Sequence, residues 1–263
     1  MKIGVLSNSL SKDVVQAMDL AAQVGADGVE IQYSDDWAPN LLDSKHGPWL
    51  AQQAADRGLA IPSLCLGTIC GRNGLLDSPE TLPATKELIA AACRVARQVK
   101  AATVVVPFFG NSLIEVEKEL DQAIVVLADL VDAAEEAGVV LGIESTLNFN
   151  QCKYLLGQFA HTETVKIYQD TGNALARKLD LPTGLRDLGR ERLAGIHFKD
   201  VTMSAPPNYN VQLGQGGVDF RAVLQSLRAI GYDDWIVLET PAGDDPSANA
   251  KANLQFVRDL ISK

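Results

Sequence analysis

Short apolar runs alternate with helical segments along this chain, and this alternation is the feature that most strongly constrains the fold class. Eight runs rich in Val and Ile are typical of buried parallel strands. They are Ile3–Ser7, Gly28–Tyr33, Ala60–Leu66, Thr103–Pro107, Val139–Glu144, Lys166–Asp170, Gly195–Lys199 and Trp235–Glu239. The intervening segments place apolar residues at helical spacing, as Phe220, Val223, Leu224 and Leu227 do. Such alternation predicts parallel strands joined by right-handed helical crossovers.

A recurring glycine marks the passage from helix to strand. Gly25, Gly58, Gly138 and Gly231 each follow a predicted helix, where a left-handed backbone is common. Eight repeats of this unit close naturally into a barrel. The competing doubly wound open sheet needs a glycine-rich phosphate loop after the first strand, which this sequence lacks. With 263 residues, close to the ~250 of such barrels, we expect an α/β protein with one (β/α)8 TIM barrel domain spanning 1–263.

Charge and hydropathy exclude several classes of protein. The net charge of -10 opposes binding to a nucleic-acid backbone. No run of about 20 apolar residues could cross a membrane. The chain starts directly with a strand rather than a signal peptide. We therefore expect a cytoplasmic enzyme acting on a small molecule, with neither nucleic acid nor membrane as a partner.

Four consecutive strands end in ionisable residues, at the edge where a barrel of this kind carries its active site. Alternation of side chains along a strand turns Glu144, His197, Lys199 and Glu239 toward the barrel mouth, and Asp170 ends the sixth strand. Any one carboxylate here is equally well explained as a helix cap or a solvated loop residue. Three carboxylates at one point would repel each other unless a cation is bound. The pattern predicts one divalent ion, Mn2+, Mg2+, Zn2+ or Co2+, held by Glu144, Asp170, His197 and Glu239.

Other polar residues near these strand ends have two readings each. Lys199 either contacts an anionic or carbonyl group of a substrate or pairs with Asp170 or Asp200. Asn173 is either a substrate contact or a cap. The irregular stretch at 201–217 has the length of an active-site lid. His46 and His161 lie in polar segments and are expected to be exposed and without a role.

In their order along the chain, these motifs resemble the xylose-isomerase-like barrel superfamily of sugar (phosphate) isomerases and epimerases. Asp170-Thr171-Gly172-Asn173 resembles the D-x-G-N signature of its L-xylulose/L-ribulose-5-phosphate 3-epimerase branch. His197-Phe198-Lys199-Asp200 resembles the H-x-K-D motif, and the segment 214–220 resembles G-x-G-x-x-D-F. Gly231-Tyr232, before a strand ending in Glu239, completes the order. The similarity extends over nearly the whole chain.

The resemblance implies an isomerase-class enzyme that moves a proton next to a carbonyl. Glu144 and Glu239 would be catalytic acid/base residues as well as ligands, and Asp170 and His197 would be ligands only. The expected reaction is 3-epimerisation of a ketose or ketose phosphate through a metal-bound enediolate. Members of the superfamily are often oligomers, which implies a homo-oligomer here.

Alternatives remain on the same scaffold. A hydroxypyruvate-type isomerase or a polyol (inosose-type) dehydratase, which is a lyase, would use the same four residues. A non-catalytic sugar-binding barrel is disfavoured because none of the three carboxylates is missing. Asn173 and Met203 stand where related epimerases of free ketoses tend to carry histidine and arginine, which makes that substrate class less expected.

Overall fold

The computed structural model describes residues 1–76 and 79–262. Parallel strands are hydrogen-bonded in chain order and close into a barrel, β1-β2-β3-β4-β5-β6-β7-β8, which confirms the predicted fold. Their bounds are Lys2–Leu6, Gly28–Gln32, Ser63–Cys65, Thr103–Pro107, Val140–Glu144, Val165–Asp170, Leu193–Phe198 and Trp235–Leu238.

The strands form where the sequence predicts them, and most ends differ by one or two residues. In β4 every residue is buried, as expected for a parallel strand covered on both faces. The largest difference lies at Ala60–Leu66, where the ladder is confined to Ser63–Cys65. Pro62 has no N–H to donate, and Ala60 makes only an isolated bridge to Gly28.

Helices follow the strands. Their bounds are α1 Val14–Val24, α2 His46–Ala55, α3 Leu82–Val99, α4 Glu117–Ala128, α5 Val131–Ala137, α6 Phe149–Gln158, α7 Thr171–Ala176, α8 Leu181–Leu188, α9 Phe220–Ala229 and α10 Pro246–Ile261. Gly25, Gly58, Gly138 and Gly231 all have positive φ, as the helix-to-strand pattern requires.

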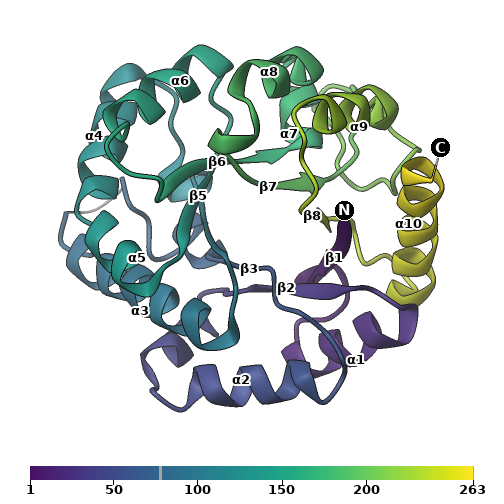
Figure 1. The fold of residues 1–263 in the computed structure, drawn as a ribbon, viewed down its shortest axis with the longest axis horizontal. Helices are drawn as coiled ribbons and strands as arrows, with labels where there is room; N and C mark the ends of the chain where they lie inside the picture. The colour runs from purple at the N-terminus through teal and green to yellow at the C-terminus, as the bar shows by residue number, and fades with distance from the viewer. Residues whose placement is uncertain (77–78, 263) are drawn as a thin grey trace. The chain divides into compact units, whose positions relative to one another are not determined.

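The chain groups into two compact units. The first consists of Met1–Ile31, Ala54–Ala60 and Gln169–Lys263. In it β1 pairs with both β2 and β8, and α10 lies beside α1 (Figure 1). Phe198 of β7 packs on Phe220 of α9, with ring centroids 5.1 Å apart, and Phe220 packs on Phe256 of α10 at 5.7 Å. These contacts fix the faces of β7: Phe198 points to the helices, so His197 points to the opposite face.

The second unit consists of Gln32–Gln53 and Ile61–Tyr168. Its sheet is centred on β4, which pairs with β3 and β5. The buried side chains Val104 and Val106 belong to this core, and α3 lies next to α5 (Figure 1). At its carboxyl end, β5 stops at Glu144, opposite Tyr168.

Candidate metal centre

His197 is fixed by two carboxylates of the first unit. It lies near the end of β7 and its side chain is almost completely buried. Nε2 is 2.8 Å from Oε1 of Glu30 on β2, and Nδ1 is 3.0 Å from Oε2 of Glu239. Both ring nitrogens therefore face acidic oxygens, and contacts on both edges of the imidazole determine its orientation.

Glu239 directly follows β8 and stands between a histidine and a lysine. Its backbone N–H donates to the carbonyl of Phe198, 3.1 Å away, which extends the β7–β8 pairing by one residue. Its Oε1 accepts a hydrogen bond from Nζ of Lys199. Burial raises the pKa of the Glu239 carboxyl, but the Lys199 ammonium and then His197 lower it by more. The net result is a pKa below the ordinary value, so the carboxylate is held ionised.

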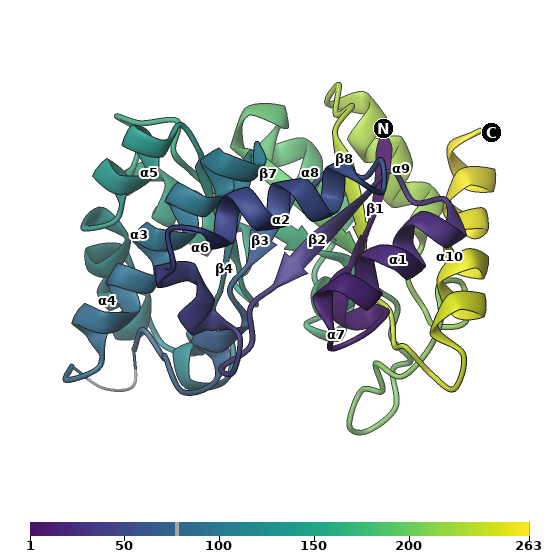
Figure 2. The same ribbon diagram turned by 90° about the horizontal axis from the view of Figure 1, so that it is seen from below.

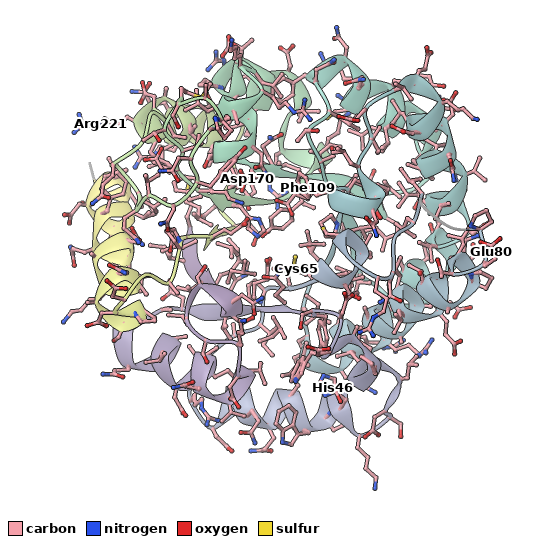
Figure 3. All side chains as sticks on the ribbon, turned by 180° about the vertical axis from the view of Figure 1, so that it is seen from behind. His46, Cys65, Glu80, Phe109, Asp170 and Arg221 are labelled. Atoms are coloured by element: carbon pink, nitrogen blue, oxygen red, sulfur yellow. The ribbon has the colours of Figure 1, made fainter. Side chains whose placement is uncertain are left out.

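Asp170 ends β6 and also caps α7. It is almost fully buried, and its Oδ1 accepts a hydrogen bond from the backbone N–H of Asn173 at 2.6 Å. Figure 3 shows Asp170 inward of α9, whereas Arg221 on that helix points away from the protein. Asn173 is therefore not the cap of this helix: Asp170 is the N-cap of α7, and the backbone N–H of Asn173 donates to it.

Glu144 is the last residue of β5. Its side chain is buried, and its carbonyl accepts a hydrogen bond of 2.7 Å from the N–H of Phe108. Each of Glu144, Asp170, His197 and Glu239 offers an atom suited to a metal, and these atoms all lie within 4.8 Å of one another. The four residues predicted from the strand ends are thus brought together.

This donor set fits a divalent cation. Three carboxylates and one imidazole combine hard oxygen donors with one nitrogen donor, a set that Mn2+, Mg2+, Zn2+ and Co2+ all accept. Two further features agree with a bound cation: the residues are mostly buried, and their negative charges are concentrated at one point.

Lys199 takes a partner that the sequence did not suggest. Its ammonium forms an ion pair with Glu239. The backbone of Lys199 is held by the side chain of Thr171. The Thr171 hydroxyl accepts a hydrogen bond from the Lys199 N–H at 2.9 Å and donates one to the Lys199 carbonyl at 2.6 Å. Gly172 permits this contact, because a Cβ there would lie 3.0 Å from Cγ of Lys199.

The loop after β7 is tied at its base by Asp200. This carboxylate is almost fully buried and accepts four backbone N–H bonds: from Val201 and Val218 through Oδ1, and from Gly214 and Gly216 through Oδ2. The lengths range from 2.9 to 3.1 Å. In Figure 2 the loop projects at the bottom, on the side of the first unit opposite the N-terminus.

Tyr209 of this loop lies over Lys199. The Lys199 Nζ is 5.4 Å from the centre of the Tyr209 ring, within the range of a cation–π contact. Burial raises the pKa of the Tyr209 hydroxyl, with opposing effects from Lys199, which lowers it, and Asp170, which raises it. The loop thus places an aromatic side chain within electrostatic reach of the candidate metal centre.

A family model described as "Xylose isomerase-like TIM barrel" matches residues 18–260 of this sequence. The chain belongs to this family. The resemblance predicted from the motifs at the strand ends is therefore confirmed at the level of the family.

Two relatives of the chain are epimerases. The chain is 27% identical to a 2-epi-5-epi-valiolone 7-phosphate 2-epimerase of Actinoplanes sp., over 98% of this chain and 93% of the relative. It is 25% identical to a 3-dehydro-D-guloside 4-epimerase of Escherichia coli, over 85% and 76% of the two chains. The structure of an L-ribulose 3-epimerase aligns with a TM-score of 0.80 at 19% identity, over 99% of this chain and 94% of the other. That last similarity supports the fold.

The sequence pattern does not indicate the structural roles of two acidic residues. Glu30 stands in the middle of the apolar strand Gly28–Gln32 and is completely buried. An acidic residue inside a buried strand is itself a signal, because a buried carboxylate needs a partner. The sequence suggests Asp200 only as a partner for Lys199, but its four backbone contacts come from residues up to 18 positions away.

His46 corrects an expectation. It was predicted to be exposed in a polar loop, yet it begins α2 and is 7% exposed. Its Nε2 is 2.9 Å from the hydroxyl of Tyr33, and its ring stacks on Trp49 and meets Trp37 edge-on (His46 is labelled in Figure 3). The aromatic side chains around it, separated along the chain, account for its burial. His161 is exposed as predicted.

Within residues 1–76 and 79–262, no helix combines the length and the apolar character needed to cross a bilayer.

Proposed function

We propose that the whole chain, 1–263, is one barrel enzyme that epimerises a ketose or ketose phosphate at C3 with the help of one divalent metal ion. The observation that carries this proposal is the group of three carboxylates and one histidine at consecutive strand ends, with ligand atoms within 4.8 Å of one another. The sugar epimerases among its relatives support an isomerase-class reaction.

In this proposal the metal ligands are Glu144, Asp170, His197 and Glu239. A bound Mn2+, Mg2+, Zn2+ or Co2+ would supply Lewis-acid polarisation of the substrate's carbonyl and neighbouring hydroxyl oxygens, an effect worth several kcal/mol. In this proposal the protein positions the metal ion, and His197 and Asp170 act only as metal ligands.

The proton is moved by two glutamates. Glu144 is the last residue of β5 and Glu239 follows β8, and these two strands are not neighbours in the barrel. One glutamate takes the proton from the carbon next to the carbonyl, and the other returns a proton to the opposite face, which inverts the carbon. Glu239 is in the ionised form that a general base requires, because the Lys199 ammonium lowers the pKa of its carboxyl.

Lys199 and Asn173 are proposed to contact the substrate. Lys199 offers a cation beside Glu239, where an anionic or carbonyl oxygen of the sugar could be bound. Asn173 is half-buried in the first turn of α7, three residues after Asp170. Its amide could donate to a sugar hydroxyl.

The test is isotope exchange. The protein is incubated in D2O with Mn2+ or Mg2+ and a panel of pentuloses and hexuloses, free and phosphorylated, together with 2-epi-5-epi-valiolone 7-phosphate and a 3-dehydroglycoside. We expect deuterium at C3 of a ketose and formation of its epimer. Exchange only at C1 would instead indicate the hydroxypyruvate-type isomerase, and loss of water would indicate the polyol dehydratase.

Variants of the two glutamates refine this experiment. Glu144→Gln and Glu239→Gln should each nearly abolish epimerisation, while one of them still allows exchange from a single epimer because its partner base remains. Full activity of both variants would refute the acid/base assignment.

Three further expectations from the sequence also stay proposals. The partner is a small sugar or sugar phosphate, the enzyme works in the cytoplasm, and it forms a homo-oligomer. Light scattering in moderate salt measures the oligomeric state directly.

A further inference from the structure

Glu30 is a buried charge that the proposed reaction does not use. It lies in the middle of β2 between Val29 and Ile31, and all three are fully buried. Removing a carboxylate from water costs several kcal/mol unless it is paired. A leucine would fill the same space in this apolar strand without that cost. The presence of a carboxylate here therefore calls for a chemical explanation.

The contact between Glu30 and His197 explains why a carboxylate is buried here. Oε1 of Glu30 lies 2.8 Å from Nε2 of His197, a residue 167 positions away along the chain. An ionised carboxylate can only accept a hydrogen bond, so this contact places the proton of the imidazole on Nε2. In the neutral imidazole the lone pair is then on Nδ1. Nδ1 is the nitrogen that faces Glu239, 3.0 Å from Oε2.

We propose that Glu30 is a positioning residue that selects the ligand atom of His197. By accepting the proton of Nε2, it turns Nδ1 toward the other metal ligands and keeps its lone pair available. This inference rests on the proposed metal site. A carboxylate behind a metal-binding histidine fixes its tautomer and raises its basicity, and loss of such a partner typically lowers metal affinity about 10- to 100-fold.

The first experiment measures metal affinity without catalysis. Metal-free parent protein and the Glu30→Gln variant are titrated with Mn2+ by calorimetry. Glutamine keeps the size of the side chain but loses the charge, and its amide can donate to Nε2 as well as accept from it. We expect Mn2+ to bind about 10- to 100-fold more weakly to this variant.

Asp27→Asn is the matched control. It removes the same charge three residues earlier, where the carboxylate accepts a 2.7 Å hydrogen bond from the N–H of Ile3 on β1. Its Mn2+ affinity should stay within about twofold of the parent. Equal affinities for the parent and Glu30→Gln would overturn the inference. Failure of the parent itself to bind Mn2+ would instead refute the proposed function.

The second experiment does not use Glu30→Gln, so it decides the matter even if that variant does not fold. The parent is labelled with 15N-histidine and saturated with Zn2+, and the two ring nitrogens of His197 are assigned by NMR. We expect the proton on Nε2 and a metal-coordinated shift on Nδ1. A proton on Nδ1, with Nε2 bound to zinc, would contradict the role of Glu30. His197→Ala identifies the signals.

Discussion

Lys199 shows how a single side chain can belong to two networks. Its ammonium pairs with Glu239, and its stem lies against Gly172 while Tyr209 covers its end. The ion pair is mostly shielded from water, with side-chain exposures of 18% and 25%. A lysine in this position balances part of the negative charge of the candidate metal centre, because its ammonium lies against the Glu239 carboxylate.

Replacement of this lysine should separate binding of metal from turnover. Lys199→Met keeps the apolar stem and removes the charge. We expect turnover to fall more than roughly tenfold, within the range for a positioned polar group, with metal content unchanged by elemental analysis. Lys118→Met, on the exposed face of α4, is the control for loss of one positive charge. Loss of metal from the Lys199 variant would show that the lysine supports the site rather than the substrate.

At the scale of elements, the loop after β7 is organised by one carboxylate. Asp200 collects four backbone N–H groups from the two ends of the loop. Gly216 is required by this closeness, because a Cβ there would lie 2.2 Å from Oδ1 of Asp200 and 2.6 Å from the carbonyl of Val201. One buried carboxylate therefore joins the two ends of the loop that carries Tyr209 over Lys199.

Asp200→Asn should loosen this loop. The amide nitrogen of asparagine cannot accept hydrogen bonds, so at least two of the four N–H groups lose their acceptor. Each buried donor left unsatisfied costs about 1–3 kcal/mol. We expect lower stability to denaturant and faster hydrogen exchange at the amides of Gly214, Gly216 and Val218.

Asp219→Asn provides the comparison, as Asp219 caps α9 by accepting from Ala222 at 3.0 Å. Asparagine caps helices about as well as aspartate, so this variant should be nearly neutral. Unchanged exchange at the three amides in Asp200→Asn would argue against the anchoring role.

At the scale of the whole molecule, the proposed metal site would couple metal binding to folding. The proposed ligands come from β5, β6, β7 and the end of β8, so they meet only in the folded chain. A ligand that binds only the folded state stabilises it by mass action, by about 2.7 kcal/mol at a free concentration 100 times its Kd.

Adding Mn2+ to the metal-free protein should therefore raise its Tm, and a chelator should reverse the effect. Asp170→Ala and His197→Ala should abolish the increase, because each removes a proposed ligand. His161→Ala, which removes an exposed histidine, should leave it intact. Equal metal-dependent shifts in all of these proteins, measured by calorimetry, would place the metal elsewhere.

Local patterns determined the barrel and the residues at its mouth. Strand and helix periods are encoded within ten or so neighbouring residues, and positive φ at Gly25, Gly58, Gly138 and Gly231 follows from what a helix end needs. Parallel strands of one barrel all end on the same side, so Glu144, Asp170, His197 and Glu239 could be expected to converge without knowledge of any contact.

Only the tertiary structure decided which partner each charge takes. Lys199 had several acids within reach along the sequence and pairs with Glu239, which lies 40 positions away. Glu30 contacts His197, and Asp200 binds the far end of its own loop. His46 is buried by the rings of Tyr33 and Trp37, which follow β2. The physical reason is that pairing depends on distances set by the packing of strands and helices. The sequence determines which charged residues are present. Which of them form pairs depends on the distances in the folded chain and on the free-energy cost of burying a charge without a partner.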